Sequence, residues 1–249
     1  MIARTTAVIE PGGVLGELSC VPPLTLRQVR GDDPGRCELR LVGSAAGPLA
    51  GDDLSLCLRL RAGARATLRA TGASLAQGRG LAEGGDLSQG RDLGRAAALS
   101  IRADLAAGAD LIADPGALIV CQGSRVDVRV ELSLAEDAVV EWHELIVLGR
   151  TGEPPGQATV RWDVTRAGRP VLRQSVALDP GLDPGLAGGH RVLACALIAD
   201  PAVAARTVVA GPAAVAQRVD QHTVLLTVLA DDAASAAREL AGLRGAARP

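Results

Sequence analysis

Alternation of apolar and polar residues dominates the chain, and it recurs as a unit of strand, short turn and second apolar run. The three units have their turns at residues 62–64, 107–109 and 136–138. Strict alternation places the apolar side chains on one face of a strand and the polar ones on the other. The repeats therefore predict stacked β-hairpins, each buried on one side, which must pile on one another to form a core. A stacked sheet body is more typical of a scaffold than of a reaction pocket.

The pattern changes towards the C-terminus. Residues 201–218 are rich in alanine with helical spacing, interrupted at Gly211, and residues 224–229 have the pattern of a strand. A helix is expected from Asp231 and Asp232 onward, with Asp as N-cap and with Leu240 and Leu243 on one face. The expected fold is mainly β with a small C-terminal helical element. We expect a single domain over 1–249, with a β body over about 1–180 and a mixed strand and helix part over about 190–246.

Composition narrows the possible functions. The chain has 249 residues, of which 48% are apolar, but it contains no Phe or Tyr and only two Trp, at positions 142 and 162. All 26 basic residues are Arg, and the formal net charge is −2, so neither charge nor aromatic content favours nucleic-acid binding. The absence of any apolar run of about 20 residues argues against a membrane-spanning helix. With no signal-peptide stretch and five scattered cysteines, we expect a cytoplasmic protein with reduced thiols. The glycine-rich residues 77–95 are expected to form a surface loop.

Known catalytic motifs are missing, whereas carboxylates gather near predicted turns. The sequence has no G-x-S-x-G elbow, no phosphate-binding loop and no H-x-x-x-H spacing. Asp52 lies at a glycine turn, Glu144 follows His143 in a strand, and Glu153 lies in the next turn. A few such groups can hold a divalent transition metal weakly and reversibly. Alternatively, the carboxylates are solvated turn residues and His143 is a hydrogen-bonded strand residue.

Several segments, in order and spread over residues 22–245, form a recognisable series: 23–27, 47–54 followed by 62–65, 114–119, 144–153, 168–173 and the final strand, Asp pair and Arg-bearing helix. Taken together, these segments resemble the urease accessory proteins called UreD or UreH. The chain departs from the family pattern at residues 69–77, where the Thr pair and the aromatic residue of a Thr-Thr-Gln-type segment are missing.

The resemblance implies a β-helix-like, two-sheet body that is not an enzyme and holds no tightly bound cofactor. It implies binding to the urease apoprotein, together with a helical UreF-type partner and a GTPase of the UreG type, in the delivery of nickel to urease. Asp52, Glu144 and Glu153 fall in the matching segments and are the candidates for a transient nickel path. Two alternatives remain: a β-solenoid binding module, for instance for carbohydrate, and a hydrolase in which Asp52 and Glu144 face each other across a cleft.

Overall fold

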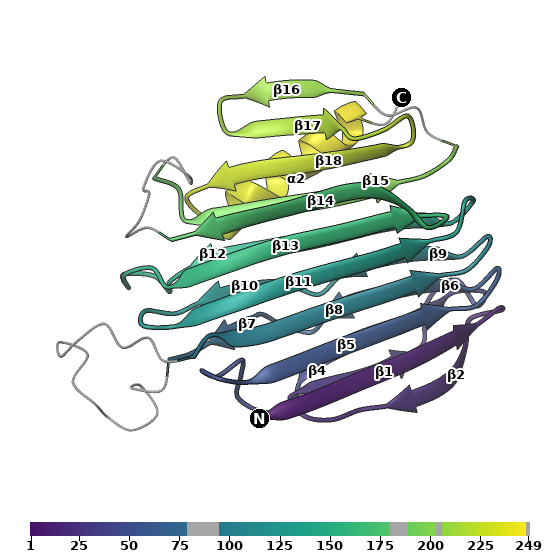
Figure 1. The fold of residues 1–249 in the computed structure, drawn as a ribbon, viewed down its shortest axis with the longest axis horizontal. Helices are drawn as coiled ribbons and strands as arrows, with labels where there is room; N and C mark the ends of the chain where they lie inside the picture. The colour runs from purple at the N-terminus through teal and green to yellow at the C-terminus, as the bar shows by residue number, and fades with distance from the viewer. Residues whose placement is uncertain (79–94, 180–188, 203–205, 248–249) are drawn as a thin grey trace.

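Two β-sheets lie face to face, and the main core fills the space between them (Figure 1). The computed structural model describes residues 1–78, 95–179, 189–202 and 206–247. The expected loop at 77–95 therefore lies almost entirely outside the described residues. Sheet A has seven strands in the order β14 (Arg169–Leu178), β13 (Gln157–Arg166), β11 (Arg125–Leu134), β8 (Ala97–Leu105), β5 (Asp53–Leu60), β1 (Ile2–Glu10) and β2 (Val14–Ser19).

Sheet B has eleven strands and is longer than sheet A. Its main order is β16 (Val208–Gly211), β17 (Ala214–Arg218), β18 (Thr223–Ala230), β15 (Val192–Ala199), β12 (Val139–Leu148), β9 (Asp110–Asp114), β6 (Arg65–Ala70), β4 (Cys37–Gly43) and β3 (Leu24–Val29). Two short strands, β10 (Ala117–Val120) and β7 (Ser74–Ala76), pair with each other, and β10 also pairs with β12. The mainly β fold with a C-terminal helical element is confirmed, and the described residues form two sheets and one helix.

The predicted pairing within each repeat is wrong, because the two strands of a repeat lie in different sheets. β5, β8 and β11 belong to sheet A, whereas β6, β9 and β12, which follow them, belong to sheet B. Each strand pairs in parallel with the equivalent strand of the next repeat, as Leu56 does with Ile101 and Ala66 with Leu111. The units are therefore coils of a two-sheet solenoid and not hairpins. Alternation specifies which face of a strand is buried. It does not specify whether the strand pairs with the other strand of its own repeat or with the equivalent strand of the next repeat.

The corners of successive coils stack on one another. Ala64, Ala109 and Ala138 occupy equivalent corner positions and are fully buried. Backbone bonds join neighbouring corners, with Gly63 N donating to Ala107 O over 2.8 Å and Val139 N donating to Ala109 O over 2.9 Å. Small side chains at this position let the corner backbones approach closely enough to bond.

Helix α2 (Ala233–Ala247) covers the outer face of β15 and β18, so this part of sheet B is buried on both faces. As predicted, Asp232 caps the helix, because its Oδ1 accepts from Ser235 N over 2.8 Å. Leu240 and Leu243 face the sheet, whereas Glu239 is exposed. Within the described residues, no helix is long and apolar enough to cross a membrane.

Residues 201–218 do not follow the predicted helical spacing. The described part of this segment forms the antiparallel hairpin of β16 and β17, which extends sheet B beyond β18. Alanine fits both helix and strand, and the valines at 208, 209 and 215 favour a strand because they are β-branched. The Gly211–Pro212 interruption is the turn of this hairpin.

Candidate functional site

Several strands of sheet B are interrupted along one line that crosses the sheet beside β12. β9 ends at Asp114 and β10 begins at Ala117, while residues 71–73 separate β6 from β7 and residues 44–48 follow β4. We call the interruptions at 44–48, 71–73 and 115–116 the seam. β12 itself is continuous, with Trp142 opposite Ala113 and Leu145 opposite Ala117. Residues 143 and 144 of β12 therefore lie level with the seam.

The turn at Pro115 and Gly116 makes the seam narrow. Gly116 has φ +83°, and a Cβ at this position would lie 2.6 Å from Ala70 Cβ and 3.1 Å from Gly72 O. Only glycine combines this backbone conformation with so close an approach. Proline has no backbone N–H for a strand ladder, so the strand ends before it.

Glu144 faces the space between the sheets, next to the seam. Its side chain is 5% exposed and shares its face of β12 with Trp142 and Ile146, both fully buried. The carboxylate lines a cavity of about 30 Å³ whose other lining residues are mostly apolar: Leu24, Leu41, Leu56, Ser74, Leu99, Ile101, Pro115, Gly116, Ala117 and Leu118. A cavity of this size admits a water molecule or a bare cation but no organic ligand.

Burial raises the pKa of Glu144 to about 7. Trp142 Nε1, which donates to Glu144 Oε2 over 3.5 Å, works in the opposite direction by favouring the carboxylate, and the charge of Asp114 adds to the rise. At neutral pH the group therefore exchanges readily between its protonated and ionised forms. A cation in the cavity would favour the ionised form.

Cys195 is the neighbour of Glu144 in the adjacent strand. The two residues are paired in the register of β12 and β15, and Cys195 lies within the main core. Burial raises the pKa of the Cys195 thiol to about 12. The charge of Glu144 also raises this pKa, whereas a hydrogen bond with Thr227 lowers it. The interior of sheet B thus places a carboxyl group and a neutral thiol side by side.

Two surface features lie near this position. Asp114 is exposed at the seam, where its Oδ1 accepts from Gly116 N over 3.0 Å. A surface depression of about 190 Å³ lies over residues 43–47 and 73–77, and Ser74 lines both this depression and the cavity at Glu144. The segment 69–77 forms one side of the seam.

Asp52 supports a turn and does not line the cavity at Glu144. Its carboxylate is 5% exposed, with Oδ1 2.6 Å from the amino group of Met1 and Oδ2 accepting from Leu49 N over 2.9 Å. The residue therefore fixes the turn that leads into β5. Metal binding by this carboxylate would require it to release these donors.

Glu153 fixes the turn after β12. Its carboxylate accepts from Arg150 N and Arg150 Nε, both over 2.9 Å, and from Gln122 N over 3.1 Å. The side-chain hydrogen bond from Arg150 is the main reason that the pKa of Glu153 is lowered. Arg150 thus pairs with a carboxylate.

Glu153→Gln is expected to loosen the turn at residues 149–156, because the amide loses the charge that holds Arg150. Trypsin should then cleave after Arg150 severalfold faster under native conditions, as measured by mass spectrometry of the fragments. Glu136→Gln, in an exposed turn between β11 and β12, is the matched control and should leave cleavage after Arg150 unchanged. Equal cleavage in both variants would show that Glu153 does not hold this turn.

The three predicted residues do not form one site. In the described part of the chain, no group of three or more His, Cys, Asp or Glu side chains is placed to hold a metal ion. His143 Nε2 lies 2.8 Å from Glu141 Oε1, which agrees with the reading of His143 as a hydrogen-bonded strand residue. Of the three carboxylates, Glu144 is the one that lines the cavity.

The two alternative functions find little support in this geometry. Both tryptophans are buried, Trp142 completely and Trp162 to 4% exposure, so neither offers a sugar-stacking surface. Asp52 and Glu144 do not share the cavity, so they do not form the paired carboxylates of a hydrolase.

Comparison with known proteins agrees with the resemblance noted in the sequence. A family model described as UreD urease accessory protein matches residues 6–249. The chain is 33% identical to the urease accessory protein UreD of Parafrankia sp. (strain EAN1pec) over 267 residues, which covers 95% of the chain and 85% of that relative. It is 31% identical to urease accessory protein UreD 3 of Streptomyces griseus subsp. griseus over 257 residues, covering 94% of the chain and 96% of the relative. The matched region includes both sheets and the seam.

Proposed function

The chain belongs to the UreD family of urease accessory proteins, and on that premise we propose that it assists the assembly of the nickel centre of urease. In this proposal the protein acts in the cytoplasm as a single non-enzymatic domain. It binds the urease apoprotein and works in a complex with a UreF-type helical protein and a UreG-type GTPase. The broad sheet faces offer the surface that such assembly requires.

The observation that carries the nickel proposal is the position of Glu144 at the seam. A buried carboxylate beside a small cavity, with an exposed carboxylate at Asp114 nearby, provides oxygen ligands at two depths. Nickel is here the cargo of the protein. Oxygen ligands in small number bind a divalent transition metal weakly, so the ion can leave again.

Cys195, which is paired with Glu144 in the register of β12 and β15, would add a sulfur ligand beside this carboxylate. Binding to its thiolate would release a proton, because a coordinated thiol is deprotonated. One carboxylate and one thiol are fewer ligands than a firm four-coordinate site uses, which suits transfer better than storage.

Asp52 and Glu153 stay in the proposal as further candidates for the path, each at a turn held by its carboxylate. Asp52 lies close to the surface depression, because a Cβ at Gly47 would be 3.6 Å from Asp52 Oδ2. Substitution of either carboxylate would therefore disturb its turn as well as the binding of a nickel ion that it contacts.

The test is activation of urease apoprotein by nickel with the complete set of accessory proteins. Glu144→Gln keeps the shape of the side chain and removes its charge, so activation should fall severalfold or more while the accessory complex still assembles. Glu239→Gln, which removes an exposed carboxylate from α2, is the matched control and should activate like the parent protein. Urease activity, nickel content and complex formation by size exclusion are measured together.

The outcomes separate the two parts of the proposal. Normal activation with Glu144→Gln would remove the nickel path through the seam and leave the assembly role standing. Failure of the parent protein to bind the apoprotein or the accessory proteins would overturn the assembly role.

Asp52→Ala is also expected to lower urease activation. Thermal unfolding of this variant is measured in parallel to check the turn that Asp52 holds.

A further inference from the structure

The outer face of sheet A carries charged side chains in register across its strands. One row crosses six strands and contains three arginines, three serines and no carboxylate: Arg4, Ser55, Ser100, Arg129, Arg161 and Ser175. Neighbouring positions in such a row are separated by the strand spacing of about 4.8 Å, so the row is about 24 Å long. It carries three positive charges in a chain of formal net charge −2.

The next row contains two carboxylates, Glu131 and Asp163, and each of them pairs with arginines. Glu131 Oε1 lies 2.7 Å from Arg129 Nε, and Glu131 also pairs with Arg102. Asp163 Oδ2 lies 3.1 Å from Arg129 Nη2, and Asp163 Oδ1 lies 3.7 Å from Arg173 Nε. The side chain of Glu131 is 17% exposed, whereas those of Arg102 and Arg173 are 56% and 72% exposed. The guanidinium groups are therefore the outermost charges of this network.

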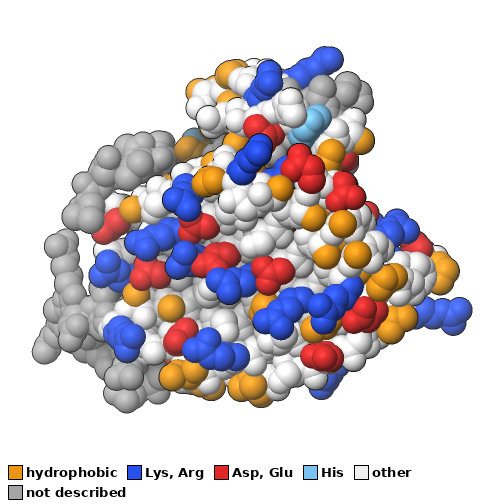
Figure 2. Space-filling model, turned by 45° about the vertical axis from the view of Figure 1, so that its right-hand side comes forward, with side chains coloured by type: hydrophobic (Ala, Val, Ile, Leu, Met, Phe, Trp, Pro, Cys, Tyr) orange, Lys and Arg blue, Asp and Glu red, His pale blue; other side chains and the backbone are white. Residues whose placement is uncertain are grey.

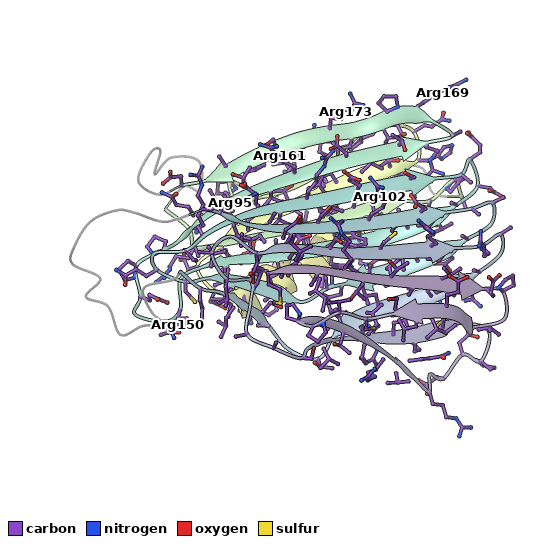
Figure 3. All side chains as sticks on the ribbon, turned by 60° about the horizontal axis from the view of Figure 1, so that its bottom comes forward. Arg95, Arg102, Arg150, Arg161, Arg169 and Arg173 are labelled. Carbon is purple, nitrogen blue, oxygen red and sulfur yellow. The ribbon has the colours of Figure 1, made fainter. Side chains whose placement is uncertain are left out.

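The figures show how the charged side chains are spread over this face. Figure 2 looks obliquely at sheet A and shows basic and acidic side chains close together over its strands. Figure 3 shows Arg95, Arg102, Arg161, Arg169 and Arg173 along one face of the molecule, with Arg150 at a distance from them. Among the residues that the structure describes, no side-chain hydrogen bond or ion pair engages Arg161, which is exposed and lies opposite Arg129 in the register. Its guanidinium donors are available to a ligand.

We propose that the outer face of sheet A, centred on Arg129 and Arg161, is a docking surface for an acidic protein segment. Arginine presents fixed N–H pairs that match carboxylates, and serine hydroxyls between the arginines add hydrogen bonds. Charge complementarity of this kind speeds association and selects the partner. Both tryptophans of the chain are buried, so the face has no aromatic platform for bases.

The test uses the full chain and a fluorescein-labelled poly-L-glutamate peptide, with binding measured by fluorescence anisotropy at two salt concentrations. Arg161→Glu should weaken binding by about tenfold at low salt, because it reverses a charge at the centre of the row. Arg30→Glu makes the same charge change at an exposed arginine after β3 in sheet B, and it should bind within about twofold of the parent protein. Arginine-specific modification by phenylglyoxal should be slowed by the peptide at Arg161 and not at Arg30.

Two results would overturn the proposal. One is equal weakening by Arg161→Glu and Arg30→Glu, which would mean that only total charge matters. The other is tighter binding of a single-stranded oligonucleotide of equal length at the same salt concentration, which would identify the face as a nucleic-acid surface. Neither result bears on the nickel path, because the seam lies in the other sheet.

Discussion

At about pH 8, Glu144→Gln is expected to raise the free energy of unfolding by about 3 kcal/mol. Burial raises the pKa of Glu144 to about 7 from an ordinary value of 4.5, so ionising the folded protein is costly. One pKa unit corresponds to about 1.4 kcal/mol, which gives about 3 kcal/mol for this shift. Glutamine has nearly the same shape and carries no charge, so the variant avoids this cost.

The gain should depend on pH in a defined direction. Between about pH 4.5 and pH 7 the folded protein holds a proton on Glu144 that the unfolded chain has released. Stability therefore falls as pH rises through this interval and is level above it, as far as Glu144 contributes. The difference in the free energy of unfolding between Glu144→Gln and the parent protein should be near zero at about pH 4.5 and should reach its full value above pH 7.

Urea unfolding followed by circular dichroism across this range measures the effect. Glu239→Gln, at an exposed position of α2, is the control and should change stability little at any pH. A difference between Glu144→Gln and the parent protein that does not vary with pH would contradict the raised pKa. Added nickel should stabilise the parent protein more than Glu144→Gln, because a ligand of the folded state stabilises it by mass action.

Trp142→Ala is expected to lower the free energy of unfolding by about 3–5 kcal/mol. Trp142 is completely buried and is the largest of the fully buried side chains, in a chain without Phe or Tyr. Neighbouring side chains such as Ile146 and Leu111 are fixed in strands and cannot fill the space of an indole ring. The substitution also removes the hydrogen bond to Glu144.

Urea unfolding of Trp142→Ala at neutral pH, followed by far-ultraviolet circular dichroism, gives the measurement. Val209→Ala is the control, because Val209 is 73% exposed on β16 and its loss should cost less than about 0.5 kcal/mol. If Trp142→Ala lowers the free energy of unfolding by less than about 1 kcal/mol, the surrounding side chains must move to fill the space of the indole ring, which would contradict the prediction.

The sequence predicts the strands of this fold better than their partners. Alternation in β5, β8 and β11 identifies the buried face of each strand, and the structure buries that face. It does not distinguish a hairpin from a coil, because both bury the same side chains. β15 was not predicted, since its eight residues are all buried and show no alternation. The signal for such a strand is an unbroken apolar run between two turn segments.

The candidate site is less accessible to sequence reasoning for a related reason. Glu144 is recognisable as a carboxylate in an apolar strand, but Cys195 lies far along the chain and reaches it only through the register of β12 and β15. Asp52 and Glu153 lie in turns, where a carboxylate serves to accept backbone N–H groups as readily as to bind a metal. Spacing along the chain does not separate these two uses.

Pairing between successive coils has a consequence for how the chain acquires its structure during synthesis. Asp53 pairs with Ala98 and Leu99 pairs with Val128, so interior strands find their partners about 30 to 45 positions away. Closing such distances slows folding and leaves each new strand exposed until the following coil has left the ribosome. Order should accordingly spread from the N-terminal coils towards α2, and the last strands to dock are those that α2 covers.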